Sequence, residues 1–406
     1  MLISEGMEMT AGTIYLDNAS TTPLRKGVLD AMMPFLTEGY GNPASIHPMG
    51  KAPRDAVAHA RESVASLIAA DPSEIYFTSG GSESDSWALK SVVLGPHSRG
   101  NHVIVSSIEH HAILNTCSYL RSMGVDVTYL PVDKDGLIDP AVVEDSIRSD
   151  TAIISVMTAN NEIGSIQPIQ EIGKIAHEHG VLFHTDAVQA YGQIDLNVTR
   201  DNIDLLSASA HKLGGPKGVG FLYVRKGIRL DPLIHGGEQE RGIRGGTTNV
   251  PGVVGFGKAA ELASISMREN SEHERMLRDH LVSRVLDEIP YTKLNGHPTS
   301  RLPGNANISF AFVEGESLLM SMAMKGICVS TGSACASGSL DPSHVLLAIG
   351  LDHATAHGSL RFTVSSENTM EEIDHTVEVL KEVVGRLRAM SPLYEDYLRN
   401  EVKEKG

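Results

Sequence analysis

The lysine at position 212 stands in a run of unusually small residues, SASAHKLGGPKG, which covers residues 207–218. A lysine used only for solubility needs no such surroundings. In a crowded, poorly hydrated site, by contrast, a lysine has a lowered pKa and can attack a carbonyl group as a neutral amine. We therefore predict that Lys212 forms an imine with the carbonyl of a bound ligand.

Other segments carry polar residues where predicted strands end. Gly81 and Ser82, in FTSGGSES, open a predicted helix whose N–H groups and dipole suit a phosphate, although an ordinary N-capped turn has the same pattern. Asp186 ends an apolar run and needs a positive partner there, unless it only caps the strand. His110, in EHHAI, is either structural or stacks on a planar ligand. Adjacent histidines do not share a face, so no metal site is predicted.

A phosphate cradle, an acid for a pyridinium nitrogen, a flat side chain for stacking and an imine-forming lysine together match one cofactor. Pyridoxal phosphate needs all of these contacts, and few other ligands do. Asp186 and Lys212 are separated by about one strand–helix–strand unit, so both can lie at adjacent strand ends. The sequence therefore predicts a pyridoxal phosphate site with Lys212 as its lysine.

Cys335 lies in STGSACASGSLDPSHV, where serine, alanine and glycine surround the thiol and no apolar neighbour buries it. Such a run predicts a surface loop, and a cysteine there is exposed to oxidation. Its presence favours a chemical use over a merely tolerated thiol. Cys117 and Cys328 lie in helical or apolar contexts and are predicted to be small core residues.

Short apolar runs alternate with helical patterns along the first part of the chain, which predicts an α/β fold with a mostly parallel sheet and helices on both faces. The predicted strands lie at residues 102–107, 151–159, 181–188, 204–210 and 220–225.

From about residue 255 a long helical pattern begins, followed by predicted strands at 305–313 and 359–364 and a charged helical tail. We therefore predict a large cofactor-binding domain, residues 17–258. A smaller α+β domain, residues 1–16 and 259–406, carries the cysteine loop at about 329–345.

The amino-acid composition and net charge argue against several classes of partner. The formal net charge of −16 and the aromatic content of 5% argue against nucleic acid or an anionic membrane as a partner. No signal peptide and no membrane-spanning run is predicted. The wide spacing of the cysteines argues against a disulfide framework and favours a reducing cytoplasm.

Many motifs in this chain occur together, in the same order, in one known family. They are YLDNASTTP, GNPASIH, FTSGGSES, EHHAI, NNEIG, DAVQ, SASAHKLGGPKGVG, HGGEQERGIRGGT and STGSACASGSLDPSHVL. With these motifs the chain resembles the cysteine desulfurases of the NifS/IscS type, class-V aminotransferases among the fold-type I pyridoxal phosphate enzymes. The resemblance extends from about Tyr15 to Phe362, and the long cysteine loop is similar to that of the NifS/IscS branch.

The resemblance implies a role for individual residues. It implies that Lys212 holds the cofactor covalently, that His110 stacks on its ring and shuttles protons, and that Asp186 holds its pyridine nitrogen. It implies that Arg361 binds the substrate carboxylate and that Cys335 accepts the sulfur. The other implied contacts are Gly81, Ser82, Ser209 and His211 to the phosphate, Gln189 and Asn161 near the ring hydroxyl and substrate, and Thr247 to the phosphate of a partner subunit.

The implied reaction converts L-cysteine to L-alanine and leaves a persulfide on Cys335, which supplies sulfur to a scaffold protein for iron–sulfur cluster assembly. A homodimer is implied as well. A plain aminotransferase or a selenocysteine lyase would share the cofactor site, but an aminotransferase has no need of Cys335. A catalytically idle, cofactor-binding interaction protein has no need of Lys212, His110 or Cys335.

Some positions depart from the commonest family pattern. Gly-Gly-Ser at 80–82 replaces a frequent Gly-Ala-Thr, which keeps a small residue and a hydroxyl, and Ala210 stands where glycine is frequent. Gly214 and Gly215 lack the aromatic residue often found after the lysine, so packing and substrate access are expected to differ there.

Overall fold

The computed structural model describes residues 12–331 and 342–404, which fall into two compact units. The larger unit comprises Thr21–Asn161 and Ser165–Arg268; the smaller comprises the described residues up to Ser20, Glu162–Gly164 and those from Glu269 onward. The sequence predicts boundaries after residues 16 and 258, and places residues 162–164 with the larger domain.

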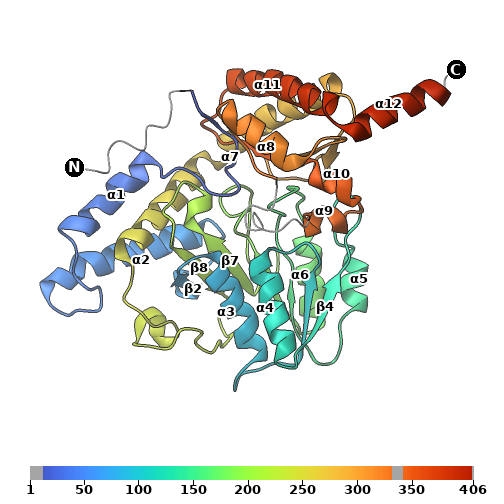
Figure 1. The fold of residues 1–406 in the computed structure, drawn as a ribbon. Coiled ribbons are helices and arrows are strands. Elements are labelled where there is room, and N and C mark those ends of the chain that lie inside the picture. The colour runs from blue at the N-terminus through green and yellow to red at the C-terminus, as the bar shows by residue number, and fades with distance from the viewer. Residues whose placement is uncertain (1–11, 332–341, 405–406) are drawn as a thin grey trace. The chain divides into compact units, whose positions relative to one another are not determined.

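A mixed sheet forms the centre of the larger unit (Figure 1), and among the described residues its strand order is β2-β8-β7-β6-β5-β3-β4. Neighbouring strands pair in parallel except at β8, which is antiparallel to both β7 and β2. The strands are β2 (Ile75–Thr78), β3 (His102–Ser106), β4 (Asp126–Leu130), β5 (Thr151–Ser155), β6 (Leu182–Asp186), β7 (Leu205–Ser209) and β8 (Gly220–Val224). The predicted fold class is confirmed.

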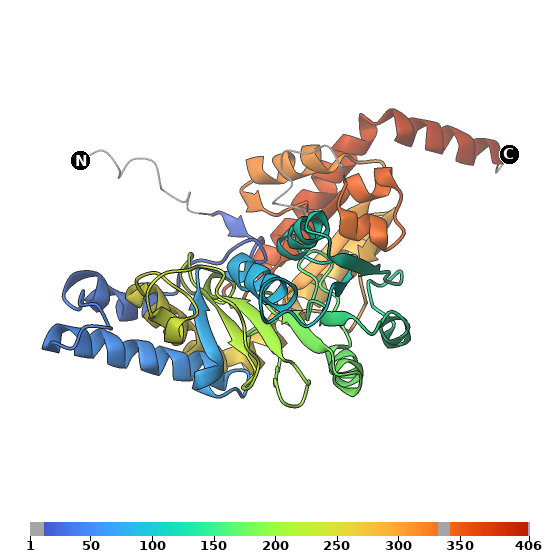
Figure 2. The same cartoon turned by 90° about the horizontal axis from the view of Figure 1, so that it is seen from below.

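The central strands are fully buried because helices cover the sheet on both faces (Figure 2). Every residue of β3, β5, β6, β7 and β8 is buried, which explains why these segments have near-continuous apolar sequences. The helices of this unit are α1 (Lys26–Thr37), α2 (Lys51–Ser66), α3 (Gly81–Val93), α4 (His111–Ser122), α5 (Pro140–Asp145) and α6 (Ile169–Glu178). No helix in the described part of the chain is long and apolar enough to cross a membrane.

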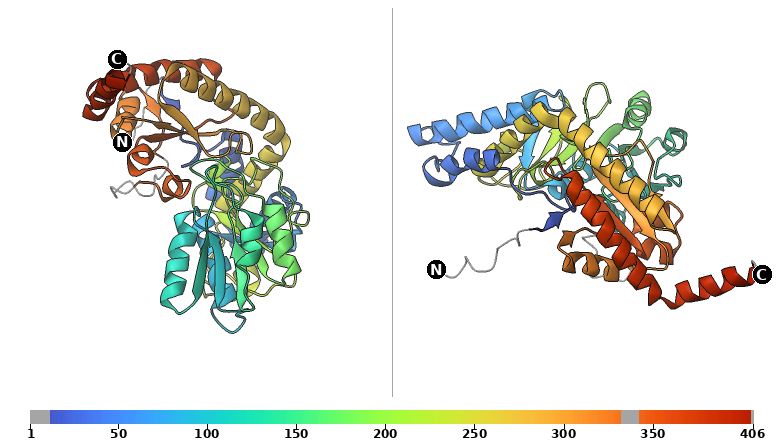
Figure 3. Two further views of the ribbon diagram at one scale, coloured as in Figure 1. Left: turned by 90° about the vertical axis from the view of Figure 1, so that its right-hand side faces the viewer. Right: turned by 90° about the horizontal axis from the view of Figure 1, so that it is seen from above.

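The long helix α7 (Val250–Glu288) starts in the larger unit and continues into the smaller one (Figure 3). The smaller unit contains an antiparallel sheet of β12 (Ser359–Thr363), β10 (Asn305–Phe310) and β9 (Thr292–Asn295), and β1 (Ile14–Tyr15) pairs in parallel with β11 (Ile327–Cys328). Its helices are α8 (Gly315–Met324), α9 (His344–Ala348), α10 (His353–His357), α11 (Met370–Ala389) and α12 (Pro392–Glu404).

Candidate active site

The start of α3 packs closely against Val188, and the residue before the helix provides no side-chain cap. Gly80, which precedes the helix, has a φ of +154° and provides no side-chain cap for the first helical N–H groups. A Cβ on Gly81 would lie only 2.6 Å from Cγ2 of Val188, so only glycine fits there without movement. Because Ser82 is in the same first turn, this end of α3 offers N–H groups, positive dipole and a hydroxyl to an anion.

Lys212 closes a short 3₁₀ turn, Ala210–Lys212, that follows directly after β7. The small residues around it have a backbone function. Gly214 has a φ of +77°, and a Cβ on Gly215 would lie 2.7 Å from the carbonyl oxygen of Ala210. A Cβ on Gly214 would also lie 2.6 Å from Cγ of Arg25, whose side chain occupies the space beside this glycine. The run therefore allows a tight turn after the lysine.

Asp186 is the last residue of β6, and its side chain is only 6% exposed. Its Oδ1 accepts a hydrogen bond from the backbone N–H of Val188 at 2.8 Å. Burial raises the pKa of Asp186, while electrostatic interaction with His110, the hydrogen bond from Val188 and electrostatic interaction with Lys212 lower it. The structure thus brings the predicted lysine, histidine and acid into electrostatic contact within one unit.

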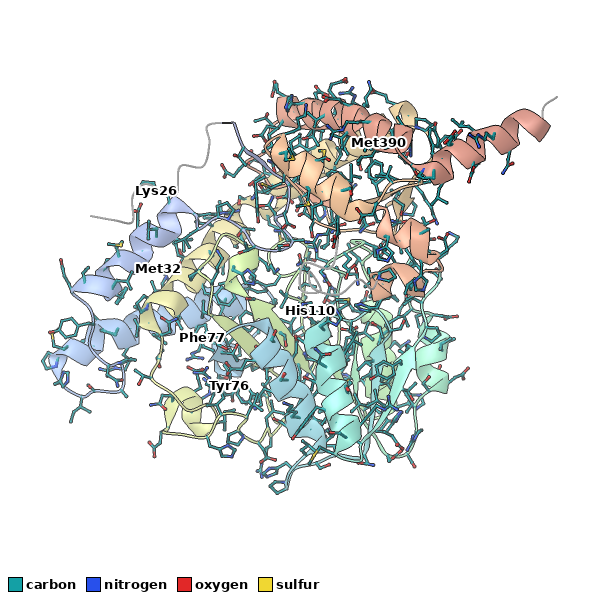
Figure 4. The ribbon with its side chains drawn as sticks, in the orientation of Figure 1. Lys26, Met32, Tyr76, Phe77, His110 and Met390 are labelled. Atoms are coloured by element: carbon teal, nitrogen blue, oxygen red, sulfur yellow. The ribbon has the colours of Figure 1, made fainter. Side chains whose placement is uncertain are left out.

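His110 is the N-cap residue of α4 and lies at the N-terminal end of that helix (Figure 4). Its Nδ1 accepts a hydrogen bond from the backbone N–H of Ala112 at 3.1 Å, so the proton of the neutral ring is on Nε2. The cap therefore fixes both the orientation and the tautomer of the ring. Its neighbour His111 points differently, with ring planes 61° apart.

His211 lies next to Lys212 and contacts the N-terminal segment of the larger unit. Its Nδ1 is 3.1 Å from Oγ1 of Thr21, and Thr22 Oγ1 donates to the backbone carbonyl of His211. Burial, together with the charges of Lys212 and Lys217, lowers the pKa of His211 to about 4. The ring is therefore neutral at pH 7 and can donate one N–H to an anion.

A buried polar layer lies beneath Asp186, on the same face of the sheet. His184 contacts Ser155 Oγ at 2.8 Å through Nδ1 and Ser207 Oγ at 3.0 Å through Nε2. Asp85 of α3 is next to it, with Oδ1 at 3.7 Å from His184 Nε2. Burial lowers the pKa of His184 to about 3, and burial followed by the charge of Asp186 raises the pKa of Asp85 far above its usual value. His184 is therefore neutral at pH 7, and burial together with the charge of Asp186 disfavours a negative charge on Asp85.

The remaining predicted cofactor residues also belong to the larger unit. Ser209 ends β7, and its Oγ would lie 3.9 Å from a Cβ on Gly80, so it is close to the start of α3. Asn161 and Gln189 follow the ends of β5 and β6, and both are partly buried. Thr247 is exposed, in a segment that an ion pair between Arg244 and Glu83 holds against α3 at 2.8 Å.

Arg361 lies on β12 of the smaller unit, with only 2% of the residue exposed. Its Nη2 donates to Oδ1 of Asp17 and to Oγ of Ser20, both at 2.8 Å. These bonds fix the plane of the guanidinium group, which is the geometry that bidentate recognition of a carboxylate requires.

The sequence predicts that Cys117 and Cys328 are core residues, and the structure confirms this for one of them. Cys117 is buried in α4, as predicted, whereas Cys328 of β11 is only partly buried. Cys335 lies outside the described residues. Among the described residues after it, Ser343 caps α9 and donates a hydrogen bond to the buried Glu162.

An anion cradle at a helix start, a buried acid, an N-capping histidine and a lysine after a strand define a pyridoxal phosphate enzyme of fold type I. The family model for class-V aminotransferases matches residues 14–376. A cysteine desulfurase IscS of Methanosarcina thermophila is 54% identical over 380 residues, covering 94% of each chain. One from Dictyoglomus turgidum is 51% identical, covering 95% of this chain and 98% of the relative. The chain belongs to the class-V aminotransferases and, within them, to the cysteine desulfurases of the NifS/IscS type.

Solved structures agree with this assignment. A NifS-like protein superposes with a TM-score of 0.87 at 39% identity, covering 93% of this chain and all of the other. A structure described as SspA in complex with cysteine has a TM-score of 0.79 at 40% identity, covering 88% of this chain.

The residues of the larger unit fit pyridoxal phosphate, the cofactor of this family. The glycine cradle at α3 and the neutral His211 suit its phosphate, and the buried carboxyl of Asp186 suits its ring nitrogen. The charge balance supports the same fit, because Asp186 is costly to bury as an anion unless a cation such as a pyridinium pairs with it. The residue types and burial at Lys212, His110 and Asp186 therefore fit this cofactor.

Glu109 is a buried acid of this unit to which the sequence assigned no role. It precedes His110, and no periodicity or composition signal distinguishes it from an ordinary loop carboxylate. Only the folded structure shows that it is enclosed.

Proposed function

We propose that this protein is a pyridoxal phosphate-dependent cysteine desulfurase, which converts L-cysteine to L-alanine and passes the sulfur to Cys335. One observation carries the proposal. Asp186, at the carboxyl end of its strand, interacts electrostatically with both His110 and Lys212, which follow the ends of two other strands. Relatives that cover almost the whole chain and are named cysteine desulfurase support it.

Each residue has a definite task in this proposal. Pyridoxal phosphate, when bound, supplies the electron sink that stabilises the negative charge left on the substrate Cα. The amine of Lys212 removes the Cα proton, and Asp186 keeps the ring nitrogen protonated. His110, with its Nδ1 occupied by the α4 cap, presents an N–H on Nε2 that can donate and exchange a proton. Arg361 binds the substrate carboxylate.

Sulfur transfer then depends on Cys335. Its thiolate attacks the sulfur of the substrate, a new S–S bond forms and the Cβ–S bond breaks. The electron pair of the broken bond stays with Cβ, which takes up a proton on the way to alanine. Only the thiolate is nucleophilic enough for this attack, so the cysteine must lose its proton near the substrate.

We also propose a homodimer in which Thr247 reaches the cofactor phosphate of the partner subunit. Large apolar side chains of α1 and of the segments on either side of it are exposed, and Ile46 is fully exposed. An apolar surface of this kind favours association with another protein surface. The exposed members are Leu24, Leu29, Met33, Leu36, Tyr40, Ile46 and Met49.

The persulfide needs an acceptor, and we propose a scaffold protein for iron–sulfur cluster assembly, in line with the IscS name of the relatives. We place the enzyme in the cytoplasm. The described cysteines, Cys117 and Cys328, form no disulfide, and a persulfide survives only where oxidants are scarce.

One assay tests the proposed activity. Purified protein loaded with the cofactor is given L-cysteine, and alanine and sulfane sulfur are measured together. The proposal predicts equal amounts of both, and none from a Lys212→Ala variant. Alanine without sulfane sulfur, or neither product from the wild type, would reject it.

A further inference from the structure

Glu109 joins the ends of two neighbouring parallel strands. Its Oε1 accepts a hydrogen bond from Ser106 Oγ at 2.7 Å and another from the backbone N–H of Met157 at 2.8 Å. Ser106 is the last residue of β3, and Met157 lies just beyond β5. The carboxyl therefore fixes the distance between two loops that leave the sheet side by side.

The loop after β3 carries His110, and the loop after β5 carries Asn161. A second bond holds the two loops together, because Asn160 Nδ2 donates to the backbone carbonyl of Ile108 at 2.9 Å. The same two loops are thus linked twice, once by Glu109 of the loop after β3 and once by Asn160 of the loop after β5. The position of the His110 ring depends on both links, since its cap on α4 starts directly after them.

The surroundings of Glu109 disfavour a charge. The side chain is fully buried, and burial raises its pKa to about 8, with the negative charge of Asp186 adding to the shift. Asp85 from α3 and Cys117 from α4 also interact with it electrostatically, and His110 is its neighbour in sequence. A neutral carboxyl still accepts both hydrogen bonds through Oε1, so charge is not needed for the link.

We propose that Glu109 is a positioning residue for His110, which links the loop after β3 to the end of β5 as an uncharged acid. The activity part of this proposal rests on the proposed desulfurase function. The link that Glu109 makes between the two loops does not depend on that function. The experiments can therefore reject the link and the effect on activity independently.

The first test uses the protein without cofactor and measures Tm against pH for the wild type and Glu109→Gln. Glutamine mimics the neutral acid. Between the unfolded pKa of 4.5 and the folded pKa of about 8, only the unfolded wild type gives up the proton, so its stability falls as pH rises. The Tm of Glu109→Gln relative to wild type should therefore increase from pH 5 to pH 8 and then level off. A difference in Tm between Glu109→Gln and the wild type that does not change with pH would overturn the proposal.

The second test compares Glu109→Gln with Glu109→Ala in the holoenzyme. Glutamine should keep kcat within about threefold of the wild type at pH 7, because its amide oxygen can accept the same two hydrogen bonds as Oε1. Alanine should lower kcat at least tenfold with little change in KM, because His110 loses its support. If the alanine variant does not fold, Ser106→Ala removes one donor to Oε1 instead.

The control is Glu274→Gln, a buried acid of the smaller unit, which has no part in the link between the two loops and should leave kcat unchanged. A glutamine variant as inactive as the alanine variant would show that the charge is needed and would overturn the proposal. Full activity of a folded alanine variant at every pH would overturn it as well. If the wild type shows no desulfurase activity, the Tm test still decides the structural part.

Discussion

The backbone N–H of Val188 donates to Oδ1 of Asp186 at 2.8 Å. The same valine occupies the space that a Cβ on Gly81 would need, at 2.6 Å. One residue therefore fixes the carboxyl proposed to hold the ring nitrogen and also requires glycine at the start of α3, where we propose that the phosphate binds. The two ends of the proposed cofactor site are coupled through Val188.

This coupling predicts that Gly81→Ala weakens cofactor binding. The added methyl group displaces Val188, at an overpacking cost of about 1–3 kcal/mol, which corresponds to a roughly 5- to 150-fold higher Kd for pyridoxal phosphate. Equilibrium dialysis of pyridoxal phosphate against the cofactor-free protein measures this Kd. The double variant Gly81→Ala/Val188→Ala should recover most of the affinity, and Gly385→Ala on α11, where no atom lies near, should change nothing. An equal loss of cofactor affinity in the single and the double variant would contradict the coupling through Val188.

Asp186→Asn should keep most of the cofactor and lose most of the turnover. Asparagine preserves an acceptor for the Val188 bond but cannot hold the ring nitrogen protonated. Each pKa unit of lost stabilisation is worth about 1.4 kcal/mol, so kcat should fall by at least about tenfold. Cofactor content by absorbance and kcat by alanine release separate the two effects. Near-normal kcat would remove Asp186 from the mechanism.

Arg361→Lys should raise the KM for L-cysteine at least about tenfold, because an ammonium group cannot bind a carboxylate through two parallel bonds. The cofactor content should not change, since Arg361 belongs to the smaller unit, whereas the residues proposed to hold the cofactor belong to the larger one. Arg284→Lys, in an ion-pair network of α7 and α11, is the control. An unchanged KM would show that another residue binds the carboxylate.

The exposed apolar side chains of α1 predict that the protein is a dimer and that Leu29→Glu weakens it. A charge buried in such an interface costs several kcal/mol unless it is paired. Analytical ultracentrifugation should show a dimer for the wild type and a monomer with reduced cofactor affinity for the variant, because Thr247 of the partner is lost. Met324→Glu, at a more exposed position on α8, should remain dimeric. A fully active wild-type monomer would contradict the prediction.

The sequence predicted the strands that are buried on both faces, because such strands have continuous apolar runs. It missed β4 (Asp126–Leu130), an edge strand with partly exposed residues whose pattern is weaker. It also gave no sign that Glu162–Gly164 belongs with the smaller unit. That association depends on contacts distant in sequence, such as Arg301 donating to the carbonyl of Ile163 at 2.8 Å.

The candidate site was predictable where a residue type is unusual for its position. Lys212 among small residues and Asp186 at the end of an apolar strand both met this condition. Glu109 and Asp85 did not, since their importance lies in complete burial, which only the fold creates. The small residues after Lys212 were interpreted as room for the lysine, whereas the glycines there also allow the backbone to turn tightly.

The central claim is that sulfur leaves L-cysteine by attack of Cys335, and mass spectrometry of the protein after L-cysteine treatment tests it most directly. The account predicts one added sulfur on the peptide that contains Cys335. In Cys335→Ala that mass should be absent although cofactor and L-cysteine still bind, while Cys117→Ala and Cys328→Ala should keep it. An added sulfur on the Cys117 or Cys328 peptide that persists in Cys335→Ala would contradict the claim.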